Sequence, residues 1–225
     1  MLHRLFLAVG LVAAAASLGA CRTTGVVKQV LGTSLGGTYD YSSLWLPLDV
    51  KTDHSIVVAV IDERPAVVKG DKSPAFVGTI SGRYRNDVDV TTKSNEPLAG
   101  VIADATTAGL QRHGITATAV PTVKPGADPE ALAAARTSGA DRLLVVHIGA
   151  WETRAVVRVE AKWQFEADVF DRSGKLLGQR RTQGAETIGT AGFDEKTNEL
   201  AVSALRQHLT YLLGDPEITR ALGGP

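Results

Sequence analysis

Residues 157–169 read VRVEAKWQFEADV, with apolar side chains at the odd positions and charged or amide side chains at the even ones. This strict period of two predicts a long strand with one buried and one solvated face. The following DRSG, residues 171–174, is typical of a hairpin turn, so residues 175–187 should return antiparallel. The charged face could be a binding surface, but charges of both signs interspersed along it are more typical of a solvated sheet face.

The regions on either side of this hairpin predict the rest of a single mixed domain. Residues 55–61, SIVVAVI, form a continuous β-branched run that indicates a strand buried on both faces. Residues 142–148 predict another strand, and helical spacing of apolar residues predicts helices. Short strands are expected at 75–80, 87–92 and 115–120, and helices at 97–113, 128–139 and 197–213. The order β-α-β-α-β-β-β-α predicts an α/β (mixed α+β) fold with a mixed sheet and packed helices.

The first 21 residues predict where the protein works. Arg4 precedes an apolar stretch, Leu5 to Leu18, that is too short to cross a bilayer stably. Leu18-Gly19-Ala20 then leads into Cys21, the one cysteine of the chain, so the chain can form no internal disulfide. This arrangement resembles the lipobox of bacterial lipoproteins. The resemblance implies cleavage between Ala20 and Cys21 and lipidation of Cys21.

The residue after the cysteine bears on which membrane holds the anchor. In enteric lipoproteins an aspartate there retains the protein in the inner membrane, and this chain has Arg22. The resemblance therefore implies the outer membrane, facing the periplasm, with the periplasmic face of the inner membrane as the alternative. Residues 1–20 are then the signal peptide, residues 21–54 the lipidated cysteine and a flexible tether, and residues 55–222 the globular domain. The apolar run 44–48 within that tether is expected to cover the domain's own core.

One possible ligand site follows the first long strand. Asp62, Glu63 and Arg64 stand where that strand ends, and the carboxyl ends of strands in open α/β sheets are favoured ligand positions. Two carboxylates there could also serve acid–base chemistry. The structural alternative is that Asp62 and Arg64, two residues apart in a turn, satisfy each other and the turn backbone.

Other motifs give weaker signals. Residues 32–36, GTSLG, match the G-x-S-x-G nucleophile pattern, but they lie in the tether without the strand and helix that a nucleophile elbow needs. The histidines show no metal-ligand spacing, so we expect no metal, no other cofactor and no enzymatic activity. The 24 basic and 24 acidic residues are well mixed, which argues against nucleic acid as a partner.

Taken in order, several stretches resemble the YajG-like family of uncharacterised bacterial lipoproteins: the lipobox, IVVAVIDERP at 56–65, the helix from 97 to 113, the strand and hairpin at 140–175, and the C-terminal helix. The family has no assigned catalytic residues, so the resemblance implies none here. More distantly, the order of elements resembles the amino-terminal domain of TolB.

These observations predict a lipid-anchored protein that binds or scaffolds an envelope protein or cell-wall component without catalysing a reaction. One alternative is an auxiliary lipoprotein of an envelope transport system, which would need a sizeable apolar cavity for a lipid. Another is an envelope-polymer hydrolase, which would need carboxylates that converge in a cleft.

Overall fold

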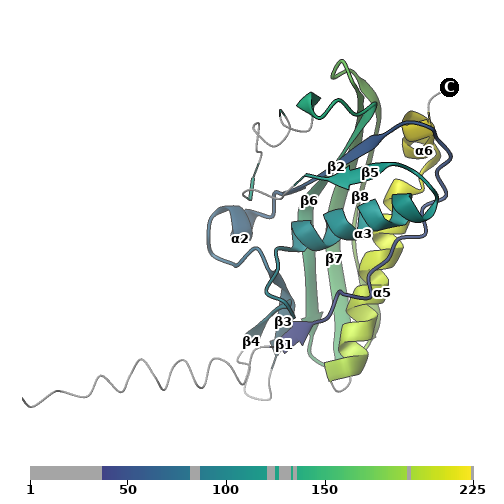
Figure 1. Ribbon diagram of the computed structural model, residues 1–225. Coiled ribbons are helices and arrows are strands. Elements are labelled where there is room, and N and C mark those ends of the chain that lie inside the picture. The colour runs from purple at the N-terminus through teal and green to yellow at the C-terminus, as the bar shows by residue number, and fades with distance from the viewer. Residues whose placement is uncertain are drawn as a thin grey trace, which may run out of the picture. The chain divides into compact units, whose positions relative to one another are not determined.

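The frame of the fold is an eight-stranded mixed sheet, seen behind the helices in Figure 1, a computed structural model. The structure describes residues 37–81, 87–120, 125–126, 133, 136–191 and 194–223. The strands are β1 (Gly37–Tyr39), β2 (Ile56–Asp62), β3 (Phe76–Ser81), β4 (Asp87–Thr92), β5 (Ala117–Ala119), β6 (Arg142–Ala155), β7 (Arg158–Asp171) and β8 (Leu176–Thr190). The helices are α2 (Pro65–Val68), α3 (Leu98–Arg112), α5 (Asp194–Leu213) and α6 (Pro216–Gly223).

The predicted fold class, a single mixed α+β domain, is confirmed. The strand order is β1-β4-β3-β6-β2-β5, with β7 paired to β6 and β8 paired to β7. β2 and β3 both run parallel to β6, one along its first half and the other along its end. β6, β7 and β8 form the long antiparallel part, which includes the predicted hairpin.

The period-two pattern of β7 has the predicted effect. Val159, Ala161, Phe165, Ala167 and Val169 are buried, while the even-numbered side chains are exposed or half-buried. Trp163 is half-buried, and Val157 lies in the turn before β7 and is 73% exposed. All seven residues of β2 are buried, as expected of a strand covered on both faces.

One large core lies between the sheet and helices α3, α5 and α6, which cover the same face of it (Figure 1). The stripe predicted for the last helix, Ala201, Ala204, Leu205, His208, Leu209 and Leu212, is buried throughout. A smaller apolar cluster on the opposite face involves Val57, Ala59, Ile61, Leu143 and Val145. The helix predicted at 128–139 lies largely outside the described residues.

The folded region starts earlier than residue 55. Residues 37–54, which the sequence analysis assigns to the tether, enter the sheet as β1 and then run between α3 and α5 (Figure 1). Leu44, Leu46 and Leu48 are buried there, so the expectation that this apolar run covers the core is confirmed. The composition misleads because only alternate side chains of the segment are apolar, and their partners are far away in sequence.

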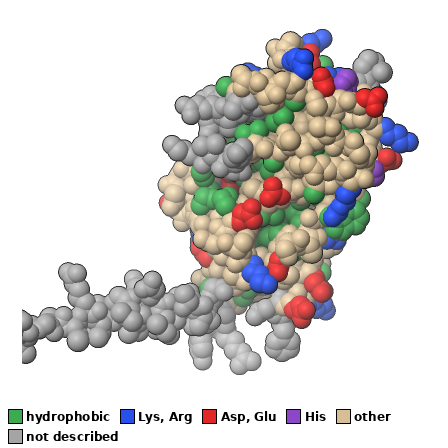
Figure 2. Space-filling model, in the orientation of Figure 1, with side chains coloured by type: hydrophobic (Ala, Val, Ile, Leu, Met, Phe, Trp, Pro, Cys, Tyr) green, Lys and Arg blue, Asp and Glu red, His purple; other side chains and the backbone are tan. Residues whose placement is uncertain are grey.

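Figure 2 shows acidic and basic side chains interspersed on the face turned to the viewer, without a patch of one sign. Among the described residues, no helix combines the length and the apolar character that crossing a bilayer requires.

Candidate functional site

In the structure, the three residues of the predicted site at the end of β2 do not lie together. Arg64 and Asp62 form a two-pronged ion pair, with Nη2 2.7 Å from Oδ2 and Nε 2.8 Å from Oδ1. Their side chains are 5% and 2% exposed. The guanidinium also donates to the backbone carbonyls of Phe76 and Pro74, which joins the β2–α2 corner to the start of β3. This is the structural alternative of the sequence analysis, and it leaves the Asp62 carboxylate no access to a ligand.

Glu63 lies apart from this pair and contacts His147, which also faces Asp168; both partners belong to the β6–β7 hairpin, called the long hairpin below. Its Oε1 is 3.0 Å from His147 Nδ1, and His147 Nε2 is 3.6 Å from Asp168 Oδ2. Burial tends to lower the pKa of His147, but hydrogen bonds to Asp168 and Glu63 outweigh it and raise that pKa above the ordinary value. Asp62 and Glu63 therefore do not converge on one cleft.

The Glu63–His147–Asp168 cluster escaped the sequence analysis because its members are distant in the chain and come from the end of β2, from β6 and from β7. The signal that could have found it is the register of the hairpin, which places His147 and Asp168 on the same outer face of neighbouring strands. The cluster holds a proton well, but among the described residues no group of three or more His, Cys, Asp or Glu is placed to hold a metal ion.

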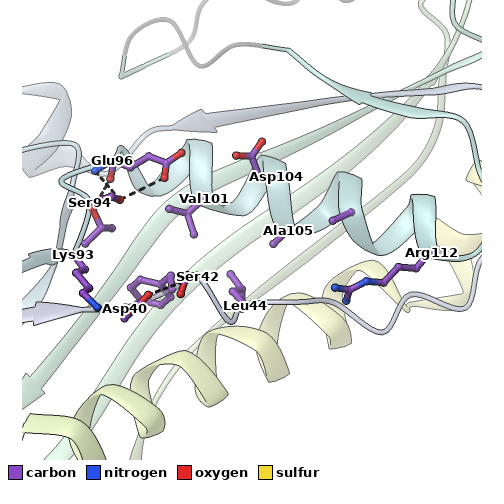
Figure 3. Close-up of a pocket in the computed structure, with 13 residues that line it drawn as sticks. Asp40, Ser42, Leu44, Lys93, Ser94, Glu96, Val101, Asp104, Ala105 and Arg112 are labelled. Atoms are coloured by element: carbon purple, nitrogen blue, oxygen red, sulfur yellow. Dashed lines mark hydrogen bonds and ion pairs between the residues drawn. The ribbon is translucent and has the colours of Figure 1, made fainter.

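A groove of about 660 Å³ lies between α3, the segment after β1 and the β4–α3 connection (Figure 3). Its apolar lining comes from Tyr41, Leu44, Val101, Ala105 and Ala108. Its polar and charged lining comes from Asp40, Ser42, Thr92, Lys93, Ser94, Glu96, Asp104 and Arg112. The segments that meet here are distant in the chain, so the spacing of residues could not predict the groove.

One end of the groove is held by a charge pair. Lys93 Nζ lies 2.9 Å from Asp40 Oδ2, and the Ser42 backbone N–H donates to Asp40 Oδ1 at 3.0 Å. Hydrogen bonds from Ser42 and Lys93 hold the pKa of Asp40 well below its usual range. Nearby, the backbone N–H of Glu96 donates to Ser94 Oγ at 3.4 Å. The Asp40 carboxylate is thus fixed in place as an anion.

Farther along α3 the charges lack such partners. Asp104 is exposed on the rim and makes no ion pair with any residue that the structure describes. Arg112 lies 5.7 Å from the centre of the Trp45 ring, and Arg206 lies 5.8 Å from the same ring. Trp45 remains 44% exposed between them. The groove therefore has the Asp40–Lys93 pair, Glu96 and Asp104 toward one end and Arg112, which lies over the Trp45 ring, at the other.

Two predicted features lie outside the described residues. These are the cleavage and lipidation site at Ala20 and Cys21, and the GTSLG motif at 32–36.

The apolar floor and charged rim of the groove are the arrangement expected of a site that binds a ligand by contact and orients it by charge.

No family model and no curated protein matches the chain. Among solved structures, it is similar to protein XCC0632 from Xanthomonas campestris, of the family DUF330. The two share 14% of residues over 81% of this chain and 95% of that one, with a TM-score of 0.53. A likeness at this identity concerns the fold alone.

Two further solved structures are similar over much of their length. One is the PelC dodecamer from Paraburkholderia phytofirmans, with 15% identity, 80% of this chain and 95% of that one covered, and a TM-score of 0.36. The other is lipoprotein GNA1162 from Neisseria meningitidis, with 14% identity, coverage of 70% and 99%, and a TM-score of 0.29. Neither TM-score reaches 0.5, so neither structure bears on this chain. The resemblances to YajG-like lipoproteins and to TolB stay predictions.

Proposed function

We propose that this protein is a lipoprotein anchored through Cys21 in the outer membrane, facing the periplasm, and that it binds another envelope component without catalysing a reaction. The binding surface is the groove along α3. The leader and the lone cysteine support the anchor, and the groove is the observation that carries the binding role.

The lining of the groove favours an extended polypeptide as the ligand. Glu96, just before α3, and Asp104, nearly two turns into that helix, line the groove and suit basic groups. Arg112 stands two turns farther on and suits a carboxylate. Between them the apolar floor offers contact to side chains. A groove open to water and lined by five charged residues suits a fatty acyl chain poorly, because a lipid is held best by an enclosed apolar cavity.

The absence of catalysis is part of the proposal. It is supported by the state of the acidic groups, since Asp40 is tied to Lys93 and Ser42, and Asp62 is buried against Arg64. A general acid or base must reach its substrate within hydrogen-bond distance, and the Asp62 carboxylate has no such access.

Site-specific crosslinking in intact cells tests the groove. A photoreactive benzoylphenylalanine replaces Asp104 on the rim, and in a second strain it replaces Ala185, which is exposed on β8 away from the groove. We expect a discrete adduct with one envelope polypeptide from position 104 and none from position 185. Isolated cell-wall sacculi, mixed with the purified lipoprotein, identify a cell-wall ligand if they sediment with it.

A variant that fills the groove makes this test specific. Ala108→Trp places an indole on the groove lining, whereas Ala185→Trp adds the same bulk elsewhere. The adduct should be lost in Ala108→Trp and kept in Ala185→Trp, with both proteins present at wild-type level. Equal adducts from both crosslinking positions, or an adduct that survives Ala108→Trp, would exclude the groove as the binding surface.

The anchor has its own test. Cys21→Ser should abolish incorporation of labelled palmitate and release the protein from the membrane fraction, because no other cysteine can take its place. A variant that stays membrane-bound and still incorporates the label would contradict the lipidation of Cys21.

A further inference from the structure

The turn between β6 and β7 exposes two adjacent valines at the end of the long hairpin. Val156 is 55% exposed and Val157 is 73% exposed, the largest exposed fraction among the exposed large hydrophobic residues that the structure describes. Arg154 and Arg158 flank them, and both are exposed. Neither arginine makes an ion pair within the described part of the chain, although Glu160 is the cross-strand neighbour of Arg154. We call residues 154–158 the hairpin tip.

The hairpin tip lies at the end of the molecule where the folded region begins. Gly37 is paired with Val90, Val90 with Gly78, and Gly78 with Thr153. Neighbouring strands are about 4.8 Å apart, so Gly37 lies about 14 Å across the sheet from the base of the tip. Figure 1 shows β1, β3 and β4 at the same end of the sheet as the far end of β6.

The early start of the fold shortens the connection to the anchor. Sixteen peptide bonds separate Cys21 from Gly37, rather than the more than thirty implied by a domain that starts at residue 55. The general relation for flexible chains gives a root-mean-square span of roughly 22 Å for a length of sixteen residues. The proposed anchor therefore holds the tip end of the domain close to the lipid surface.

We propose that the hairpin tip is a second membrane contact: Val156 and Val157 enter the headgroup region of the leaflet that holds the acylated cysteine, while Arg154 and Arg158 contact lipid phosphates. The inference rests on the proposed lipid anchor. Apolar side chains flanked by cationic ones are the composition of interfacial membrane contacts, because the interface offers both acyl chains and anionic phosphates.

A contact this small binds only because the anchor is already in place. Two valines bury little apolar area, and Asp87 and Glu195 near the same end reduce the positive charge. Tethering converts the second contact into an intramolecular event at a high effective concentration, so a weak site is occupied. The contact orients the domain, with the β7–β8 turn at the opposite end of the hairpin pointing away from the membrane.

Fluorescence from a single labelled position tests the contact. Cys21 carries lipid in the proposed mature protein, so Val157→Cys supplies one free thiol in the full-length lipoprotein. The matched control is Leu177→Cys, because Leu177 is an exposed apolar residue at the opposite end of the hairpin, 37% exposed. Each variant is labelled with nitrobenzoxadiazole and reconstituted in vesicles of phosphatidylethanolamine and phosphatidylglycerol.

We expect the label at position 157 to be several-fold brighter on the vesicle-bound lipoprotein than on the same protein cleaved from its anchor and kept in detergent-free buffer. Spin-labelled lipids in the vesicles should quench it. The label at position 177 should change little. Replacing Arg154 and Arg158 by serine should remove most of the increase. If both labels stay in a watery environment while the protein floats with the vesicles, the tip proposal is wrong and the anchor stands. If the wild-type protein does not float with vesicles, the anchor itself fails, and the tip proposal with it.

Discussion

At the scale of single residues, the Asp62–Arg64 pair shows how a buried charge can be structural. Each carboxylate oxygen of Asp62 accepts from the guanidinium, and two backbone carbonyls take further donors. Removing one member of such a pair leaves an uncompensated buried charge, which costs more than the pair itself contributes. The position at the end of a strand, which favoured a ligand site in the sequence, is here used to fix a corner of the chain.

Arg64→Ala should lower the free energy of unfolding by about 3–5 kcal/mol, because Asp62 is left buried and charged without a partner. Urea unfolding followed by circular dichroism measures the loss. The control is Glu63→Ala, where a partly exposed carboxylate is removed and the change should stay below about 1 kcal/mol. An Arg64→Ala protein as stable as wild type would show that the pair does not hold the corner.

The pKa shifts of two histidines predict opposite effects of pH on stability. Burial opposes the charged form of His147, but hydrogen bonds to Asp168 and Glu63 outweigh it and raise the pKa above 6.5. The contribution of His147 to stability is therefore present below that pH and lost as pH rises through the raised value. Burial lowers the pKa of His208 below 6.5, despite Glu186, so its contribution is present above 6.5 and lost as pH falls toward the lowered value.

Replacing each histidine by glutamine should therefore change the slope of stability with pH in opposite directions. His147→Gln should make the protein lose more stability than wild type between about pH 8 and pH 5.5, and His208→Gln should make it lose less. The measurement is the urea midpoint across this range. His208 also stacks on Trp163 at 3.7 Å, so the comparison uses the slope and not the absolute stability. Slopes that shift in the same direction would contradict the assignment.

At the scale of elements, α3 depends on a close contact with the segment that runs beside it. A side chain at Gly109 would place a Cβ 2.7 Å from the carbonyl oxygen of Leu46. A backbone oxygen held in a packed segment cannot move away cheaply, so glycine is required there. Gly100, on the same helix, would meet only the flexible end of the Glu96 side chain, at 3.2 Å.

This difference predicts that a glycine-to-alanine substitution changes the stability of the protein in opposite directions at two positions of α3. Gly100→Ala should stabilise the protein by about 0.5–1 kcal/mol, because alanine is the better helix former. Gly109→Ala should destabilise it by about 1–3 kcal/mol, because the contact with residue 46 must open. Thermal unfolding of the two variants and wild type, side by side, decides the matter. A gain in stability at Gly109 would mean that the segment is not packed against α3 as described.

The elements that the sequence predicted best are those whose pattern is local. The alternation in residues 158–169 and the continuous run in β2 set burial by periodicity alone, and both agree with the structure. β1 is the short segment Gly-Thr-Tyr, and its place depends on pairing with β4, which comes much later in the chain. The groove likewise depends on contacts between segments that are distant in the chain, because Asp40 and Lys93 are neighbours only in space. Local patterns carry no information about such contacts.

Across the whole domain, the three longer helices lie on one face of the sheet. Helices α3, α5 and α6 cover one face of the sheet, and much of the opposite face of the long hairpin carries side chains of both charges. The tip of that hairpin and β1 lie at one end, so in the proposed lipid-anchored protein the connection to the anchor governs how close the tip comes to the membrane. The length of that connection is then a functional variable.

Lengthening the connection tests this dependence. A flexible Gly/Ser insertion after Gly36 is made long enough to bring the chain between Cys21 and Gly37 to roughly three times its natural length. The effective concentration of the tip at the lipid surface would then fall about fivefold, following the −3/2 power of length. The label at Val157→Cys should lose most of its vesicle-dependent brightness, while the protein stays bound to the vesicles through its acyl chains.

The control places the same insertion in the β7–β8 turn, at residue 173, where it leaves the anchor connection unchanged and should leave the label bright. Undiminished brightness after the first insertion would mean that the tip binds lipid without help from the anchor, or that the label reports something other than the membrane. Loss of brightness from both insertions would contradict the dependence on the length of the connection, because an insertion that leaves the connection unchanged would then have the same effect.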